Sequence, residues 1–346
     1  MTDEEHDSGV AYLNPEEGAV VPPPVARPPS ASDSRGSGPA RTLLLGSSEH
    51  PVGEPGHAAV RGLIPGQVLA GRYQVERWLG SGGSAMVHEV MDLTTGAHLA
   101  LKVLAVPGAD ASQIARFRQE VEHVRGLDHP NIVRVHAVGV DGDRHFITTE
   151  LLVGMDLKRR LMGHRPTLAE ALRWLTHAAA ALEHAHGRGV LHRDVKPGNL
   201  FLTKPGILKL MDFGLAKSSH VAGVTAQGAV LGTPEYMAPE QISGAHAVSP
   251  ATDLYSLGVV AYELLTGQLP FRHPQAVPLM FLHVQQPPVP PRTLTPSLPE
   301  PFERVVLKLM RKHPEHRYPS AAALRGDLAR LWPLALPPKA GERPSP

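Results

Sequence analysis

The sequence predicts an α+β fold with a strand-rich first part and a helical second part. Short apolar runs separated by glycine fill residues 73–152. From Leu168 onward, apolar residues recur instead at the three- and four-residue spacing of amphipathic helices. Because each part can bury its own apolar surface, we expect two lobes with a cleft between them.

Both ends of the chain differ in composition from the middle. Residues 1–66 are rich in proline, glycine, serine and alanine, and residues 333–346 are again rich in proline. Such segments bury too little apolar surface to offset the entropy lost on ordering. We therefore expect a disordered leader, a loose tail and, between them, a domain over 67–332. Its N-lobe should span about 67–151 and its C-lobe about 152–332.

The first lobe has the pattern of a small sheet with one helix. Strands are expected within Tyr73–Met91 and Ala97–Val103, and again over Ile132–Val140 and His145–Leu152. Between the two pairs, apolar residues at helical spacing predict an amphipathic helix over Ile114–Val124.

Helices are expected throughout the second lobe. One should run from Leu168 to near Gly187. The segment Asp253–Leu265 is apolar nearly all round, which indicates a buried helix, and Gly267 is placed to stop it. Later helices are expected over Phe302–Met310 and Ala321–Trp332.

Composition excludes several classes of protein. The 346 residues include 34 Lys and Arg against 33 Asp and Glu, so no global field attracts nucleic acid or an anionic membrane. Cysteine is absent, which excludes disulfides, thiolate metal sites and cysteine nucleophiles. No apolar run reaches the roughly eighteen residues of a membrane-spanning helix. The acidic, polar start of the chain does not resemble a secretory signal. We expect a cytoplasmic protein with no nucleic-acid partner and no membrane span; the sequence does not fix the oligomeric state.

The twenty histidines are scattered along the chain. His184 and His186 are close, but no third ligand follows at metal-binding spacing. We interpret them as packing or surface residues of a helix.

A glycine-rich loop, Gly80-Ser81-Gly82-Gly83-Ser84-Ala85-Met86-Val87, follows an apolar strand. Glycine lets backbone amides approach phosphate oxygens closely, although a plain hairpin turn would have the same composition. Lys102 ends the next expected strand, and a lysine is rare in an apolar strand unless its ammonium has a partner. Glu120, near the buried face of the expected helix, is the preferred partner, and Glu122 is the alternative.

The octet His192-Arg193-Asp194-Val195-Lys196-Pro197-Gly198-Asn199 holds groups that phosphoryl transfer needs. A carboxylate can orient an attacking hydroxyl, a lysine can steady the phosphate, and an amide oxygen suits a hard cation. The runs Leu200–Thr203 and Ile207–Met211 form an expected hairpin. It would return Asp212, of Asp212-Phe213-Gly214, to the side of Asn199. A simple turn is the alternative for an isolated Asp-Phe-Gly.

Residues of about 73–332 resemble the eukaryotic-like serine/threonine protein kinases of the bacterial type. The motifs that carry the resemblance occur in the family's order: the glycine loop, Lys102, Glu120, His192-Arg193-Asp194, Asp212-Phe213-Gly214, Ala238-Pro239-Glu240, Asp253 and Arg317. The resemblance implies a bilobal protein-kinase fold, with a β-rich N-lobe containing one helix and a larger helical C-lobe. It also implies ATP and Mg²⁺ as ligands and protein substrates with Ser or Thr acceptors.

The resemblance assigns roles to individual residues. Asp194 would be the base or hydroxyl-orienting group. Lys196 would stabilise the γ-phosphate and is typical of Ser/Thr rather than Tyr kinases. Asn199 and Asp212 would hold Mg²⁺, while the Lys102–Glu120 pair would face the α- and β-phosphates.

The resemblance also implies a nucleotide pocket. The residues expected to line it are Leu79, Gly80, Gly82, Gly83, Val87, Ala100 and Phe201. Val87, Ala100 and Phe201 would sandwich the purine. Glu150 and Leu152 would offer it backbone hydrogen bonds, with Thr149 as the gatekeeper. Ala85 occupies the position of the third glycine in the family's loop, and we expect it to weaken nucleotide binding without abolishing it.

Further implied features concern regulation and stability. Arg193 would pair with a phosphate on the activation segment, for which Thr225 is the preferred site and Ser218 and Ser219 the alternatives. Thr233 would brace Asp194 and shape the acceptor site. Glu240 and Arg317 would form a buried ion pair.

Three functions are compatible with this pattern. An active ATP-dependent protein Ser/Thr kinase that phosphorylates its own activation segment is preferred. A pseudokinase acting as a nucleotide-binding scaffold would usually lack one of Lys102, Asp194 or Asp212, and all three are present. A small-molecule phosphotransferase would usually lack the Ala238-Pro239-Glu240 element.

Overall fold

A computed structural model describes residues 63–82, 85–104, 121–204, 206–213, 233–244 and 247–336. Several predicted positions lie outside these ranges, namely Gly83, Glu120, Gly214, Ser218, Ser219 and Thr225. Most of the expected helix over Ile114–Val124 also lies outside them, and residues 121–125 are its described helical end.

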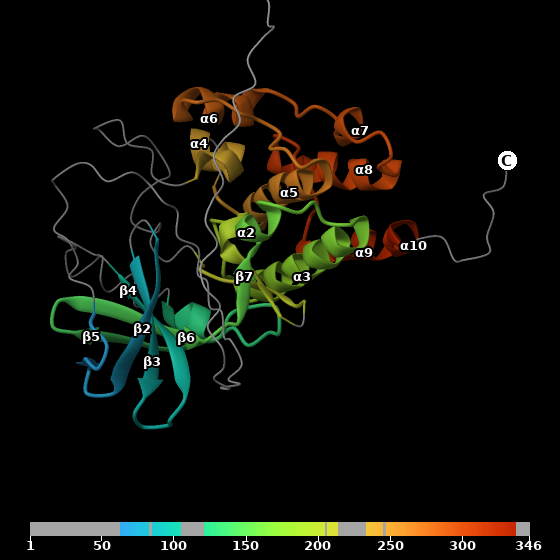
Figure 1. The fold of residues 1–346 in the computed structure, drawn as a ribbon. Coiled ribbons are helices and arrows are strands. Elements are labelled where there is room, and N and C mark those ends of the chain that lie inside the picture. Colours follow the sequence, from blue (N-terminus) through green and yellow to red (C-terminus); the bar gives the residue numbers. More distant parts are fainter. Residues whose placement is uncertain are drawn as a thin grey trace, which may run out of the picture. The chain divides into compact units, whose positions relative to one another are not determined.

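A six-stranded antiparallel sheet comes first in the chain (Figure 1). Its strands are β1 (Val68–Leu69), β2 (Tyr73–Gly82), β3 (Ala85–Asp92), β4 (His98–Leu104), β5 (Val135–Asp141) and β6 (Arg144–Glu150). The spatial order is β1-β2-β3-β4-β6-β5. Alternate residues of these strands, such as Val75, Leu101 and Phe146, are buried together on one face and form the sheet's core. The strand-rich first lobe is therefore confirmed.

A second, three-stranded sheet follows, built from β7 (Gly154–Asp156), β8 (Leu200–Thr203) and β9 (Leu208–Leu210) in that order. The pairing of β8 with β9 confirms the expected hairpin. Gly154 is required in β7, because a Cβ atom there would lie 1.9 Å from the carbonyl oxygen of Leu202. Ile132 was expected to start a strand, but it forms an isolated parallel bridge with Leu210, and β5 begins only at Val135.

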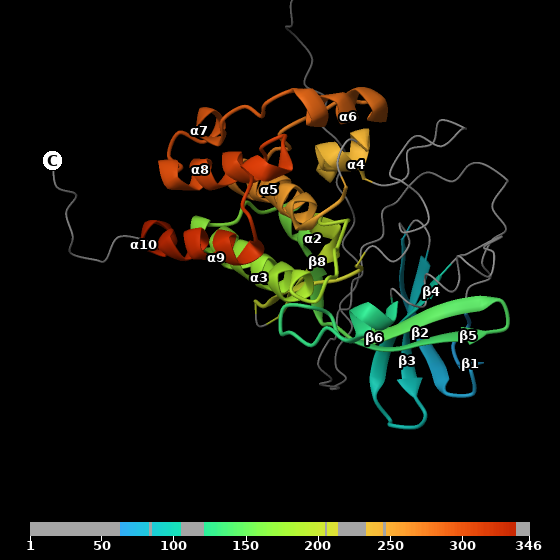
Figure 2. The ribbon, with the colours of Figure 1, turned by 180° about the vertical axis from the view of Figure 1, so that it is seen from behind.

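Helices make up most of the remainder (Figures 1 and 2). They are α2 (Leu157–Leu161), α3 (Leu168–His186), α4 (Pro239–Ser243), α5 (Pro250–Thr266), α6 (Ala276–Gln285), α7 (Pro291–Leu294), α8 (Glu300–Leu309), α9 (Ala321–Arg330) and α10 (Trp332–Ala335). Among the residues that the structure describes, three single 3₁₀ turns accompany them: η1 (Pro197–Asn199), η2 (Pro234–Tyr236) and η3 (Pro314–His316). Within the described ranges, no helix combines the length and the apolarity needed to cross a membrane.

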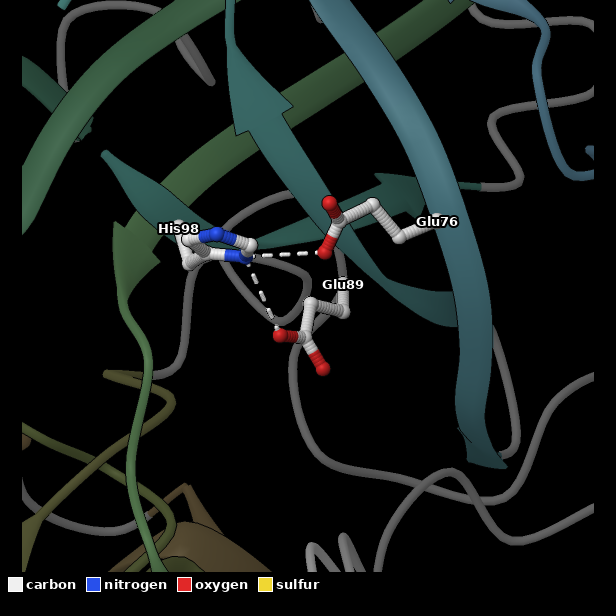
Figure 3. A group of neighbouring side chains, drawn as sticks. All are labelled: Glu76, Glu89 and His98. Carbon is white, nitrogen blue, oxygen red and sulfur yellow. Dashed lines mark ion pairs between the residues drawn. The ribbon is translucent and has the colours of Figure 1, made fainter. Parts of the chain in front are cut away.

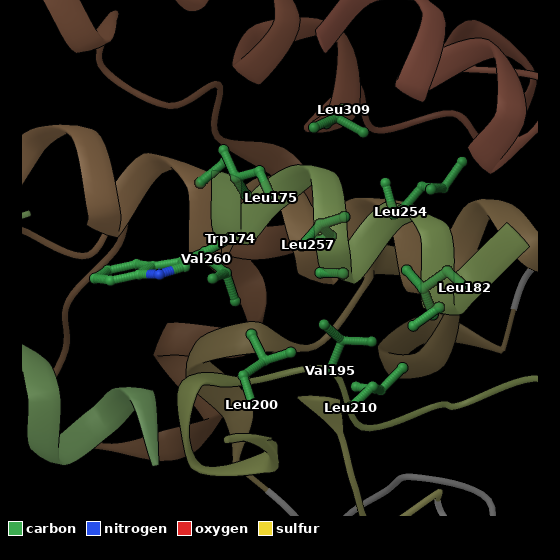
Figure 4. Packing of buried hydrophobic residues seen from close by; sticks show 14 of the residues in the cluster. Trp174, Leu175, Leu182, Val195, Leu200, Leu210, Leu254, Leu257, Val260 and Leu309 are labelled. Carbon is green, nitrogen blue, oxygen red and sulfur yellow. The ribbon is translucent and has the colours of Figure 1, made fainter. Parts of the chain in front are cut away.

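Local sequence explains where the two long helices begin and end. Thr167 and Glu170 form a reciprocal capping box at the start of α3. At the C-terminal end of α5, Gly267 adopts a left-handed φ of 74°, as expected for a glycine that stops a helix. The helix α5 is buried on nearly all sides, and its Leu254 and Leu257 share the apolar core with Leu175 and Leu182 of α3 (Figure 4).

Ordered packing extends slightly beyond both ends of the expected domain. Leu63 is buried in the core of the six-stranded sheet, four residues before the expected start at 67. At the other end, α10 continues to Ala335, which packs in the helical core.

The expected buried ion pair joins α4 to the loop after η3. The Arg317 guanidinium donates from Nη1 to Glu240 Oε1 at 2.7 Å and from Nη2 to Glu240 Oε2 at 2.8 Å. Neither side chain is exposed. Arg317 also donates to three backbone carbonyls, those of Ala251, Arg311 and Lys312. Because the two buried charges, on Glu240 and Arg317, neutralise each other, removal of one residue would leave the charge of the other buried without compensation.

Replacement of Arg317 should therefore destabilise the fold strongly. We expect Arg317→Met to lower the free energy of unfolding by about 3–5 kcal/mol. The matched control is Arg325→Met, because Arg325 pairs with Glu183 at an exposed site and its loss should cost less than about 1 kcal/mol. Urea denaturation followed by circular dichroism measures both values. Equal losses in the two variants would contradict the structural role of the buried pair.

Candidate functional site

The octet predicted to carry chemistry lies in the loop between α3 and β8. The buried carboxylate of Asp253, on α5, holds this loop. Its Oδ1 accepts a hydrogen bond from the Arg193 amide at 2.7 Å, and its Oδ2 accepts from the His192 amide at 2.9 Å. His186, at the end of α3, lies 2.8 Å from the same Oδ2 through its Nε2.

The backbone of Arg193 is strained, with a φ of 61° in the region that favours glycine. Two neighbours fix it in this conformation. Asp253 holds its amide, and Gln241 Nε2 donates to its carbonyl oxygen at 3.0 Å. The strain turns the chain sharply just before Asp194, so the direction of the Asp194 side chain depends on these contacts.

Burial has opposite consequences for the pKa values of Asp253 and His192. Burial alone raises the pKa of an aspartate, but hydrogen bonds from His186 and the loop amides reverse this, and the pKa of Asp253 lies below its usual value. Burial lowers the pKa of His192, whose ring is therefore neutral at pH 7. Its Nδ1 accepts from the Asp194 amide at 3.2 Å, so its Nε2 carries the proton and donates to the carbonyl oxygen of Met211 at 2.9 Å.

Three predicted residues, Lys196, Asn199 and Thr233, gather at the carboxylate of the fourth, Asp194. Lys196 Nζ lies 3.0 Å from Asp194 Oδ2, and the same ammonium donates to Thr233 Oγ1 at 3.0 Å. Asn199 Nδ2 donates to Asp194 Oδ2 at 3.0 Å and to the Asp194 carbonyl oxygen at 2.8 Å. These contacts fix one oxygen of the carboxylate from two sides. Thr233 belongs to the segment before η2, so the structure brings the octet and this distant segment together.

The segment with Asp212 lies beside the octet, as expected from the hairpin. The amide of Met211 donates to the carbonyl oxygen of Asn199 at 2.9 Å. Asp212 then adopts a left-handed φ of 57°, and the ring of Phe213 lies 4.8 Å from that of His192.

Lys102 contacts this segment directly. Its Nζ lies 2.7 Å from Asp212 Oδ1, which joins β4 to a residue 110 positions later. The preferred partner, Glu120, lies outside the described residues. The alternative partner, Glu122, is 53% exposed and forms an ion pair with Arg125, so it is not the partner of Lys102 in this structure.

A small apolar cluster lies apart from the two main cores. Its buried members are Leu79 and Ala100, and the partly buried residues packed against them are Val87, Leu151 and Val153. Three of these residues were predicted to line a nucleotide pocket. Leu151 and Val153 were not, because the two residues follow β6 in a segment without a recognisable period. Phe201, also predicted here, is buried in β8 next to β7.

The backbone groups of Glu150 and Leu152, which were expected to contact adenine, differ in their hydrogen bonds within the protein. The Glu150 amide already donates to the carbonyl oxygen of Arg134 at 3.0 Å. Its carbonyl oxygen accepts a 3.3 Å hydrogen bond from Thr149 Oγ1 and can accept a second. Within the described part of the chain, the Leu152 amide donates no hydrogen bond. A carbonyl from Glu150 and an amide from Leu152 are thus the groups to which a ligand can bind.

Comparison with known proteins decides the family. The protein kinase domain matches residues 73–327, which include strands β2 to β6 of the sheet, the octet and the ion pair Glu240–Arg317. The chain belongs to the protein kinase family. Its sheet-rich lobe and helical lobe are the two lobes of the protein kinase fold.

Bacterial serine/threonine-protein kinases are among the relatives of this kinase domain. PrkC of Bacillus subtilis is 35% identical over 268 residues, which cover 77% of this chain and 41% of PrkC. PknA of Mycobacterium tuberculosis is 38% identical over 288 residues, covering 81% of this chain and 66% of PknA. The DNA damage-responsive kinase RqkA of Deinococcus radiodurans is 40% identical over 280 residues, covering 79% and 41% respectively. The chain thus spans less than two thirds of the length of these relatives.

The buried Asp253 makes the stability of the kinase domain depend on pH. We expect Asp253→Asn to unfold more easily at pH 7, by about 1–3 kcal/mol, because an amide cannot accept from all its present donors. A carboxylate whose pKa is lowered by folding contributes its full stabilisation above its pKa in the unfolded state, about 3.9. This stabilisation is lost as the pH falls through the pKa in the folded state. The difference between wild type and variant should therefore shrink as the pH falls below 4.

Urea midpoints measured between pH 7 and pH 3 test this expectation. Asp143→Asn, at an exposed turn, serves as the control and should differ little from wild type throughout. If the difference in stability between wild type and Asp253→Asn stays constant over this pH range, the charge of the carboxylate does not stabilise the fold.

Proposed function

We propose that this chain transfers the γ-phosphoryl group of ATP to Ser and Thr hydroxyls of proteins. The observation that carries the proposal is the set of contacts around Asp194, whose carboxylate is held by Lys196 and Asn199 while Lys196 also binds Thr233. The proposed catalytic domain covers about residues 67–332, divided near residue 151.

The nucleotide would bind between the apolar cluster and Phe201. Val87 and Ala100 would cover one face of the purine, and Phe201 the other. The carbonyl oxygen of Glu150 and the amide of Leu152 would hydrogen-bond its edge. Lys102 would bind phosphate oxygens in place of its present contact with Asp212, and Gly80, Gly82 and Gly83 would let backbone amides approach the phosphates. Glu120 remains the proposed partner that would hold Lys102 there.

Two oxygen donors fit a divalent cation. Asn199 Nδ2 donates hydrogen bonds to the carbonyl oxygen and to Oδ2 of Asp194, so the amide oxygen of Asn199 is the atom of this side chain that would bind a cation. The Asp212 carboxylate, 38% exposed, supplies the second donor. Oxygen donors of this kind suit Mg²⁺, which we propose as the ion held here. When bound, the ion neutralises charge on the phosphates.

In the proposed reaction, Asp194 orients the acceptor hydroxyl and takes its proton as the new O–P bond forms and the bond to ADP breaks. Lys196 offers its ammonium to the transferred phosphoryl group. The Thr233 hydroxyl holds Lys196 at Asp194, and a small pocket lined by Asp194, Thr233 and Tyr236 lies next to these groups. Lys196 and Thr233, which resemble the residues of Ser/Thr kinases at these positions, support Ser and Thr as acceptors over Tyr.

Specific observations weigh against the two alternatives. A nucleotide-binding scaffold without transfer does not need Asp194 bonded to both Lys196 and Asn199. A small-molecule phosphotransferase does not need the segment from Thr233 to Glu240, which here is joined to the catalytic loop through Lys196 and Gln241.

Autophosphorylation is also proposed, with Thr225 as the main site and Arg193 as the partner of its phosphate. Phosphopeptide mapping after incubation with ATP and Mg²⁺ tests this. Phosphate found on Thr225 would support the proposal, and phosphate found only among residues 1–66 would refute it.

Replacing Asp194 should separate catalysis from binding. We expect Asp194→Asn to fold normally and bind nucleotide but to lose about 10²–10⁴-fold in kcat, because an amide cannot take the proton. Asp212→Asn should in addition weaken nucleotide binding in the presence of Mg²⁺. Transfer of labelled phosphate to a generic protein substrate and binding of a fluorescent nucleotide measure the two effects. Asp143→Asn is the control, and wild-type transfer by Asp194→Asn would disprove the catalytic assignment.

Thr233 provides a matched pair of variants. Thr233→Ser keeps the hydroxyl that accepts from Lys196 and should retain most activity. Thr233→Val keeps the shape but removes the hydroxyl, and we expect a loss of about tenfold to a hundredfold in kcat, with little change in the KM for ATP. If the two variants have equal kcat values, the hydrogen bond to Lys196 does not position the site.

A further inference from the structure

Glu76, Glu89 and His98 form a cluster on three neighbouring strands that the proposed phosphoryl transfer does not use. They belong to β2, β3 and β4, and their side chains point toward one another (Figure 3). His98 Nδ1 lies 2.8 Å from Glu76 Oε2 and 3.4 Å from Glu89 Oε1. One nitrogen and two oxygen atoms lie within 4.8 Å of one another.

A β-bulge builds the cluster. Val75 pairs with Val90 and Arg77 pairs with Glu89, so Glu76 is an extra residue in β2. In a regular strand Glu76 and Arg77 would point to opposite faces of the sheet. Here both reach Glu89, with Arg77 Nη2 at 2.6 Å from Glu89 Oε2. The bulge thus turns Glu76 toward the cluster.

The cluster lies on the face of the sheet that carries Ala100. Glu89 pairs with Ala100 across the strands, and His98 precedes Ala100 by two residues, so all three side chains share one face. Ala100 belongs to the apolar cluster proposed to hold the purine. The two clusters are therefore direct neighbours on this face.

Burial and charge favour a cation at this place. Glu89 is nearly buried, with 6% of its side chain exposed, and Arg77 binds one of its oxygens while the other faces His98. The carboxylates of Glu76 and Glu89 and the guanidinium of Arg77 together give the cluster a net charge of −1 when His98 is neutral. The side chains of Glu76 and His98 are 33% and 42% exposed, so an ion can enter from solvent.

We propose that Glu76, Glu89 and His98 form a binding site for a divalent transition-metal ion, with Zn²⁺ as the best match. Tetrahedral Zn²⁺ with bonds of about 2.0–2.1 Å holds its ligand atoms about 3.3 Å apart, and the two separations from His98 Nδ1, 2.8 and 3.4 Å, lie on either side of this value. An imidazole with two carboxylates is a mixed ligand set that suits zinc better than Mg²⁺, which prefers oxygen alone. His98 would bind through Nδ1 and carry its remaining proton on Nε2, and water would fill the fourth position.

Titration of the full, chelator-treated chain with Zn²⁺ in the absence of ATP tests the site. His98→Ala removes one ligand, and His136→Ala is the matched control, because His136 is an exposed histidine on β5 of the same sheet. We expect wild type and His136→Ala to bind one more ion than His98→Ala, or to bind it at least tenfold more tightly. Glu76→Gln, which keeps the shape of the side chain, should also weaken binding at least tenfold.

Two further measurements accompany the titration. Zn²⁺ should raise the unfolding temperature of wild type and of His136→Ala, but not that of His98→Ala, since a ligand stabilises only the state that binds it. Co²⁺ used as a spectroscopic probe should give the visible absorption of a four-coordinate ion in wild type and in His136→Ala, but not in His98→Ala. Equal zinc binding by wild type, His98→Ala and Glu76→Gln would overturn the proposal and leave His98 as an ordinary ion-pair partner of the two carboxylates. None of these results depends on phosphoryl transfer, so the two proposals can fail separately.

Discussion

The arrangement of the catalytic loop depends on one buried carboxylate. Asp253 accepts from the amides of His192 and Arg193 and thereby holds a strained backbone immediately before Asp194. Its own position is secured because α5 is buried on nearly all sides in the helical core. The apolar packing of α5 fixes Asp253, and Asp253 in turn orients the carboxylate of Asp194 in a loop some 60 residues earlier in the chain.

From this anchor, the contacts spread in two directions. Through His192 and Met211 they reach Asp212 and then Lys102 on the six-stranded sheet. Through Gln241, which binds the carbonyl oxygen of Arg193, they reach α4 and the segment with Thr233. The non-covalent links in these paths are hydrogen bonds or ion pairs of 3.0 Å or less, so the two lobes and the segment beside Thr233 are connected to the same loop.

Spacing along the sequence was sufficient to predict that Lys196 and Asn199 would lie near Asp194, whereas Thr233 was assigned to this site only through the resemblance to kinases. Asp194, Lys196 and Asn199 lie within one short loop, and the hairpin that returns Asp212 is visible in the alternation of apolar residues and turn residues. The contribution of Leu151 and Val153 was not predictable, because it depends on which side of an irregular segment faces Ala100. The cluster around Glu89 was hidden for a different reason. Its members come from three strands, and a bulge, which leaves no trace in the periodicity, brings Glu76 to it.

The ion pair between Glu240 and Arg317 has a consequence for synthesis on the ribosome. The two residues are 77 positions apart, so α4 emerges long before its cationic partner. Until Arg317 is available, burial of Glu240 would place an uncompensated charge in the core, which opposes closure of the packing around α5. The helical lobe therefore cannot reach its final packing as a growing chain. Its folding waits until almost all of it has been made, and the earlier sheet is free to form first.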